Sequence, residues 1–111
     1  MSPQQQQPAI LPTVGRVVLY RPNLSDPQDQ AIVTAGSEPL AAIVCRVWGP
    51  GTVNLCLFDA NGHTHSRTSV QLVQAHEPKP SGRYCEWMPY QLGQAARHAA
   101  AEAPALAGSA S

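Results

Sequence analysis

The sequence predicts an all-β fold: a small five-stranded barrel, SH3-like or partly open, with a short C-terminal helix and extended tails. The chain has 111 residues, which is the length of one domain. Its 11 prolines and 8 glycines favour short strands with frequent turns over a helical bundle. Runs of β-branched and aromatic residues alternate with turn-forming residues, as in a small β protein.

Five segments are expected to form strands, because each is rich in residues that suit a pleated, half-buried surface. Gly49-Pro50-Gly51 predicts a tight hairpin between two of them. Asp59-Ala60-Asn61-Gly62 supplies the positive φ angles that the next turn needs. The expected strands cover residues 14–20, 40–48, 52–58, 65–73 and 83–87.

The connection between the first two strands, from Pro22 to Pro39, is long for a small barrel. Only Ala31–Thr34 within it resembles a strand. Loops of this length are usually functional or ordered by something that they touch. After the fifth strand, Pro89 and the alanine-rich sequence that follows predict a short C-terminal helix.

Three regions differ in composition. Residues 1–11 are rich in Gln and Pro and are expected to be a flexible arm, residues 12–98 are expected to be the single folded domain, and residues 99–111 form an Ala-rich tail. Neither end has enough large apolar side chains to fold by itself. We therefore expect both ends to act as contact segments.

Alternation along the strands predicts apolar side chains on both faces. In the second strand, Val44, Arg46 and Trp48 are expected on one face, and Ile43, Cys45 and Val47 on the other. In the fourth, Val70 and Leu72 are expected to share a face with Ser66 and Thr68. An apolar outer face on so small a domain predicts a homo-oligomer or a place in a larger assembly.

Charge excludes one class of partner. Seven Lys and Arg balance seven Asp and Glu, so the net charge is zero, and a generic binder of nucleic acid or of an anionic membrane surface is not expected. Arg16, Arg46, Arg67 and Arg83 lie in or beside expected strands and could form a local anion-binding site if they share a face. Otherwise each is a solvated residue on its own strand.

The cysteine pattern and the N-terminal sequence indicate the compartment in which the protein is expected. The three cysteines show no C-x-x-C pair, and no basic segment followed by an apolar one opens the sequence. No apolar run approaches the ~18 residues that span a bilayer. We expect a reduced, intracellular chain with no membrane segment.

Candidate chemistry in the sequence is sparse. His63 and His65 could bind a metal with a third ligand such as Asp59, Cys56 or His76, yet two such ligands make no site, so neither metal nor cofactor is expected. No nucleophile motif is present, and the strand cysteines are typical of small buried hydrophobes.

Carboxylates offer no catalytic pair in the sequence. Asp26, Asp29, Glu38 and Glu77 fall in loops and are expected to be solvated. With no motif for a nucleophile and no paired acids, we do not expect an enzyme.

Aromatic residues mark the expected protein-binding surface. Trp48, Trp87, Met88 and Tyr90 are the expected interaction residues, because Trp and Tyr are enriched at binding hot spots and Met adapts to irregular partners. The alternatives are that Trp87 closes the barrel and that Tyr90 caps the core.

Five short motifs resemble, in order, those of a family of small proteins encoded by tailed phages and prophages. The motifs read PTVGRVVLY, AAIV leading to VW, VNLCLF with its following Gly62, TSV, and the closing WMP, and the resemblance covers roughly residues 12–95. The chain departs from the commoner pattern at Leu19, where a His often stands, and at the closing Trp-Met-Pro-Tyr. The resemblance implies a genomic setting and no catalytic residues.

In that setting two functions are expected. The first is a non-enzymatic virion protein that decorates or cements a capsid through its tails and apolar outer face, found in the host cytoplasm during infection and then in the virion. The alternative is an accessory protein against host defence, which binds a host protein or sequesters a nucleotide signal through an Arg- and Trp-lined site.

Overall fold

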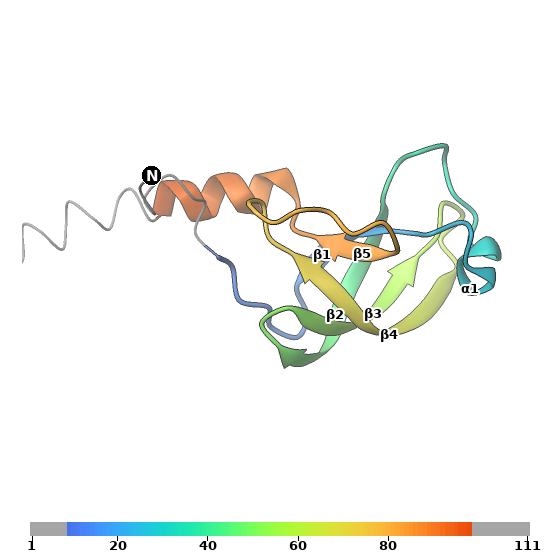
Figure 1. The fold of residues 1–111 in the computed structure, drawn as a ribbon, viewed down its shortest axis with the longest axis horizontal. Coiled ribbons are helices and arrows are strands. Elements are labelled where there is room, and N and C mark those ends of the chain that lie inside the picture. Colours follow the sequence, from blue (N-terminus) through green and yellow to red (C-terminus); the bar gives the residue numbers. More distant parts are fainter. Residues whose placement is uncertain (1–8, 99–111) are drawn as a thin grey trace, which may run out of the picture.

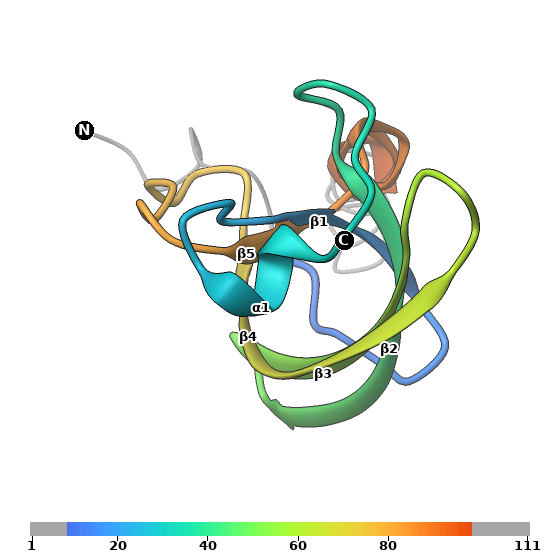
Figure 2. The ribbon, with the colours of Figure 1, turned by 90° about the vertical axis from the view of Figure 1, so that its right-hand side faces the viewer.

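The computed structural model describes residues 9–98 and shows a closed barrel of five strands in the order β1-β2-β3-β4-β5 (Figures 1 and 2). Neighbouring strands are antiparallel except β4 and β5, which run parallel. The strands are β1 (Val17–Arg21), β2 (Leu40–Gly49), β3 (Thr52–Phe58), β4 (Thr64–Val73) and β5 (Tyr84–Glu86). The all-β, SH3-like prediction is confirmed, and the barrel is closed rather than partly open.

β1 begins three residues later than the sequence predicts, because a tight turn precedes it. Gly15 adopts φ +94°, and the Arg16 N–H donates to the Thr13 carbonyl at 3.2 Å. A glycine at this left-handed position lets the chain reverse without a steric penalty. The other four strands lie within one residue of their expected bounds at each end.

Inward-facing side chains from all five strands form one core. Trp87, directly after β5, belongs to it: the residue is 2% exposed, and its indole N–H has no hydrogen-bond partner among the described residues. Trp87 is therefore a core residue, which is the alternative that the sequence left open for it, and it is not on the exposed surface. The strand residues of the core are Val18, Tyr20, Leu40, Ala42, Val44, Val53, Leu55, Leu57, Val70, Leu72 and Cys85.

A β-bulge in β2 changes which side chains face outward. Val44 pairs with Leu55 and Arg46 pairs with Asn54, so Cys45 is an extra residue on β2. Beyond the bulge Val47 packs against the core, and Arg46 and Trp48 are exposed. The face predicted for Arg46, Val47 and Trp48 is therefore reversed.

β4 contains a second bulge, with the same consequence. Arg67 pairs with Leu55 and Val70 with Val53, which places one extra residue on β4 between Arg67 and Val70. Ser69 lies in this bulge with φ +56°. Val70 consequently shares the inner face with buried Arg67 instead of with Thr68, contrary to the prediction.

The long β1–β2 connection holds α1 (Pro27–Gln30) and no strand, so the strand resemblance of Ala31–Thr34 is not realised. Asp26 caps this single turn by accepting from the Gln28 N–H. Asp29 is fully buried beneath it, which corrects the expectation of a solvated acid. The loop is thus held by a buried carboxylate together with Ile32, which is 5% exposed and belongs to the core.

Asp29 joins the loop to the barrel through three donors. The Tyr20 hydroxyl donates to its carboxylate at 2.8 Å, Arg67 Nε donates at 2.9 Å, and the Asn23 N–H donates at 2.9 Å. Burial first, and then the hydrogen bond to Asp29, raise the pKa of Tyr20 well above its ordinary value. Figure 2 shows that α1, which this network holds, lies across the end of the barrel that faces the viewer.

The N-terminal arm attaches to the barrel before the expected domain boundary at residue 12. The Gln74 side chain accepts from the Ile10 N–H at 3.0 Å and donates to the Ile10 carbonyl at 2.9 Å, as a neighbouring strand would. Ile10 also packs against the core. The rest of the predicted arm, residues 1–8, and the predicted tail, residues 99–111, lie outside the described residues.

A C-terminal helix extends away from the barrel, as predicted (Figure 1). It is described over residues 89–98. The Gln91 side chain accepts from the Met88 N–H at 2.8 Å and donates to the Val17 carbonyl at 3.0 Å, so one side chain caps the helix and ties it to β1. No helix in the described part of the chain is long and apolar enough to span a membrane.

Candidate functional site

The strongest candidate is an exposed patch that we call the Trp48 surface, made of Arg46, Trp48 and Asn54. Trp48 is 53% exposed on the outer face of β2, which is unusual for so large an apolar side chain. The Arg46 guanidinium lies over its ring, 3.7 Å from the centroid. This stacked pair unites two residues that the sequence predicted for separate roles, Trp48 for interaction and Arg46 for anion binding.

Hydrogen bonds fix the indole in place. Asn54 on β3 accepts from Trp48 Nε1 at 2.8 Å and from the Ser69 N–H at 2.8 Å, both on its Oδ1 atom. The stacking of Arg46 adds an electrostatic attraction to the ring. Because Trp48 is already ordered, little side-chain entropy remains to be lost when a partner covers it.

Two bulges converge on Asn54. The extra residue on β2 turns Arg46 and Trp48 outward, and the extra residue on β4 aims the Ser69 N–H at the Asn54 side chain. Positive φ is uncommon for residues other than glycine, and strained backbone concentrates at functional sites. A further register shift lies between Val47 and Gly49, so Trp48 is itself an extra residue on β2. The Trp48 surface thus lies where the strand pairing is irregular.

Apolar surface continues from the Trp48 surface along the outside of β2 and β3. Ile43 and Cys56 are paired across these strands, and both are partly exposed, as is Phe58. Cys45 is exposed beside them. An apolar outer face was predicted for the central strands. It is present on β2 and β3, but the exposed residues of β4 are polar: Thr64, Ser66, Thr68, Ser69 and Gln71.

The four arginines predicted as an anion site have different surroundings. Arg67 is 5% exposed, and its guanidinium bonds to Asp29 and to the Ser66 and Gln28 carbonyls. Arg83 donates to the Gln28 side chain and lies 4.0 Å from Asp26. These two serve the α1 loop, and Arg46 stacks on Trp48, so the predicted cluster does not assemble.

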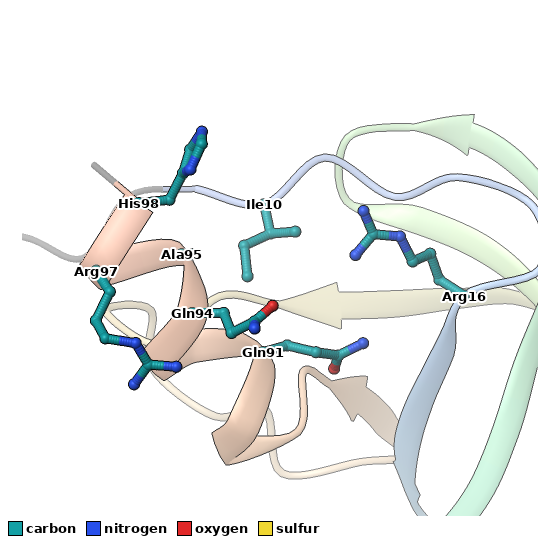
Figure 3. Close-up of a pocket in the computed structure, with 7 residues that line it drawn as sticks. All are labelled: Ile10, Arg16, Gln91, Gln94, Ala95, Arg97 and His98. Atoms are coloured by element: carbon teal, nitrogen blue, oxygen red, sulfur yellow. The ribbon is translucent and has the colours of Figure 1, made fainter. Parts of the chain in front are cut away.

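Arg16 lines a groove between the N-terminal arm and the C-terminal helix (Figure 3). The groove encloses about 490 Å³. Its lining residues are Ile10, Arg16, Gln91, Gln94, Ala95, Arg97 and His98. We refer to it below as the helix–arm groove.

Met88 and Tyr90 lie at the start of the helix. Met88 is partly buried, and Tyr90 is 65% exposed, so Tyr90 does not cap the core. Exposure leaves Tyr90 available to a partner, as the prediction for it requires. Neither contributes to the Trp48 surface.

His63 and His65 gather around Asp59, between β3 and β4. His65 Nε2 lies 2.9 Å from Asp59 Oδ2, and His63 Nδ1 lies 3.7 Å from the same oxygen. The hydrogen bond from His65, with those from the His63 and Asn61 N–H groups, lowers the pKa of Asp59 to about 2. No metal-binding group of three His, Cys, Asp or Glu occurs in residues 9–98.

Cys85 and the histidines show no catalytic arrangement. Burial, and then the nearby Glu86 charge, raise the pKa of the Cys85 thiol to about 12, which keeps it in the unreactive thiol form. Within the described chain, the carboxylate of Asp59 is the hydrogen-bond partner of the His65 ring. No described hydrogen bond joins a thiol or hydroxyl to His63, His65 or His76.

Sequence reasoning missed two residues that matter here: Asn54 and Gln91. Asn54 was given no role, although an Asn within a strand is uncommon enough to suggest a side-chain role. Gln91 lies three residues after Met88, the spacing of a capping box.

Comparison with protein-family models, curated proteins and solved structures finds no match to this chain.

Proposed function

We propose that this chain is a non-enzymatic binding module that docks on a protein partner through the Trp48 surface. The tailed-phage resemblance of its sequence suggests the setting: the partner is a virion protein, and the module decorates or cements the capsid. The observation that carries the docking role is the exposed, prearranged stack of Arg46 on Trp48.

The composition of the Trp48 surface supports a protein partner. Trp and Arg are the residue types that dominate binding energy at protein interfaces. The partly exposed apolar strip beside it, from Ile43 to Phe58, extends the area that a partner can bury. Asn54 and Arg46 supply hydrogen-bonding groups at the edge of this apolar area.

We propose a non-enzymatic role because the side chains that could react have structural roles in the fold. Asp29 and Arg67 neutralise each other inside the barrel, and Asp59 holds the β3–β4 turn. The Cys85 thiol is buried. These groups have structural partners, which is the usual reason for such residues in a small domain.

Mass spectrometry of purified phage particles tests whether the chain is a component of the virion. Particles produced by the phage or prophage that encodes this chain are banded on a density gradient, and the chain is quantified against the major capsid protein. We expect a copy number in fixed ratio to the capsid protein. Absence from banded particles, with the chain abundant in the same lysate, would overturn the virion role.

A further inference from the structure

The outer sides of β1, β2 and β3, which are neighbouring strands of the barrel, form one continuous apolar face (Figure 2). Val18, Ala42 and Leu57 point inward and are 0% exposed, so the residues on either side of each point outward. We call the outward residues the β1–β3 face. They lie in two adjacent rows across the strands, Val17, Ile43 and Cys56 in one row and Leu19, Ala41 and Phe58 in the other.

Each residue of the β1–β3 face is exposed or partly exposed, and none of the six carries a charge. On β1, Val17 is 38% exposed. The apolar strip from Ile43 to Phe58 is the part of this face on β2 and β3, and Val17 and Leu19 extend it to a third strand. Soluble monomers seldom expose contiguous apolar surface of large extent, and such surface marks a site of interaction.

Polar groups border the β1–β3 face on both sides. On the β5 side, Arg21 Nε and Lys79 Nζ both donate to Glu86, at 2.8 Å and 2.6 Å. On the β4 side, the exposed hydroxyl residues Thr64 and Ser66 lie next to the face. An apolar centre between polar rims is the usual arrangement of a protein–protein interface.

The chemistry of the face and of its rims favours a second copy of the chain as the partner. Because the face has no charge and its strands pair with one another, two copies can bury it against itself without leaving a charge or a backbone group unpaired. A two-fold rotation about an axis along the strands sets the β5 side of one copy against the β4 side of the other. Arg21 and Lys79 then meet hydroxyl oxygens, and the cations of the two copies stay apart.

We propose that the chain forms a two-fold symmetric homodimer through the β1–β3 face. Homodimer interfaces are more apolar than those of transient complexes, as this face is. The second copy is then the partner that buries the strip from Ile43 to Phe58. No residue of the Trp48 surface belongs to the face, so the dimer presents two Trp48 surfaces. Resting on the proposed function, this arrangement joins two capsid subunits, which is cementing rather than decoration.

Sedimentation equilibrium of the purified full chain tests the dimer in the absence of phage particles. We expect the mass of two chains at high concentration, with a dissociation constant of roughly 1–100 μM. Ile43→Glu and Val17→Glu should each raise this constant about tenfold or more, because a two-fold contact buries the new charge twice. Gln71→Glu, which places the same charge on the exposed outer side of β4, should leave it unchanged.

Three results would overturn the proposal. They are a chain that stays monomeric up to about 1 mM, a dimer that both face variants leave intact, and a Trp48→Ala variant that is monomeric, which would place the contact at the Trp48 surface. Circular dichroism of each variant checks that the barrel is retained, as expected for side chains outside the core. Because no particle takes part, a monomeric chain leaves docking through the Trp48 surface untested, and failed docking to particles leaves the dimer intact.

Discussion

Asp29 is the buried charged residue of the β1–β2 loop, and it accepts hydrogen bonds from three different residues. A buried carboxylate without partners is costly, but Tyr20, Asn23 and Arg67 together satisfy this one. Arg67 in turn depends on Asp29 for its counter-charge. The sequence did not reveal this pair, because its members are 38 residues apart and both types are usually solvated.

Replacing Asp29 with asparagine should therefore strongly destabilise the barrel. Asp29→Asn leaves the Arg67 charge buried and unpaired, and we expect the free energy of unfolding to fall by about 3 kcal/mol. Tyr20→Phe removes one neutral donor and should cost about 1–2 kcal/mol. Urea denaturation at neutral pH measures both, and an Asp29→Asn variant as stable as the wild type would contradict this role.

Asp59 makes stability depend on acid pH. Its pKa is about 2 in the folded protein against an ordinary 3.8, so its contribution is complete above pH 4 and is lost as the pH falls toward 2. Asp59→Asn should show a smaller loss of stability over this range than the wild type. Urea denaturation at a series of pH values measures the difference.

Glu86 provides the matched control for Asp59. Burial acts to raise its pKa, but hydrogen bonds from Lys79 and Arg21 outweigh burial and hold the pKa below the ordinary value. Glu86→Gln should retain the part of the acid dependence that belongs to Asp59. Identical pH profiles for the wild type and Asp59→Asn would show that the Asp59 interactions do not stabilise the fold.

Among the elements, the bounds of the three central strands could be predicted from the sequence, but which of their side chains face outward could not. Pattern and turn residues placed β2, β3 and β4 to within a residue. Each bulge inserts one residue, and a single insertion reverses every side chain beyond it. Cys45 and Ser69 give no sequence sign of a bulge, so the exposure of Trp48 and the burial of Arg67 emerge only from the paired strands.

The bulge in β4 can be tested at Ser69, whose φ is +56°. Ser69→Val places a β-branched side chain in a left-handed conformation and should lower the free energy of unfolding by about 1–2 kcal/mol. Ser69→Gly should be nearly neutral, because relief of strain offsets the greater freedom of the unfolded chain. Thermal denaturation measures both, and equal tolerance of Val and Gly would contradict the bulge conformation.

The helix depends on Gln91 in a way that hydrogen exchange can measure. Gln91→Ala removes the bond from the Met88 N–H and the bond to the Val17 carbonyl. We expect faster amide exchange over residues 89–98, with global stability lowered by no more than about 1 kcal/mol. Unchanged exchange in the helix would show that Gln91 does not anchor it.

At the scale of the whole molecule, the barrel is closed and filled, so a binding site has to lie on its outer surface. Pairing of β5 with both β1 and β4 completes the sheet, and the core fills its interior with side chains. Within residues 9–98, the candidate surfaces for recognition include the Trp48 surface on the outer face and the helix–arm groove beyond the barrel. The zero net charge conceals an uneven distribution: acids neutralise Arg67 and Arg83 beside the α1 loop, whereas no ion pair within residues 9–98 involves Arg16.

Docking through the Trp48 surface is tested most directly by adding the purified chain back to particles that lack it and measuring co-sedimentation. The wild type should sediment with the particles, and Trp48→Ala should bind at least tenfold more weakly at an unchanged melting temperature. Leu24→Ala is the matched control, because Leu24 is 54% exposed, close to the 53% of Trp48, and lies in the α1 loop. Equal sedimentation of Trp48→Ala and the wild type would contradict docking through this surface.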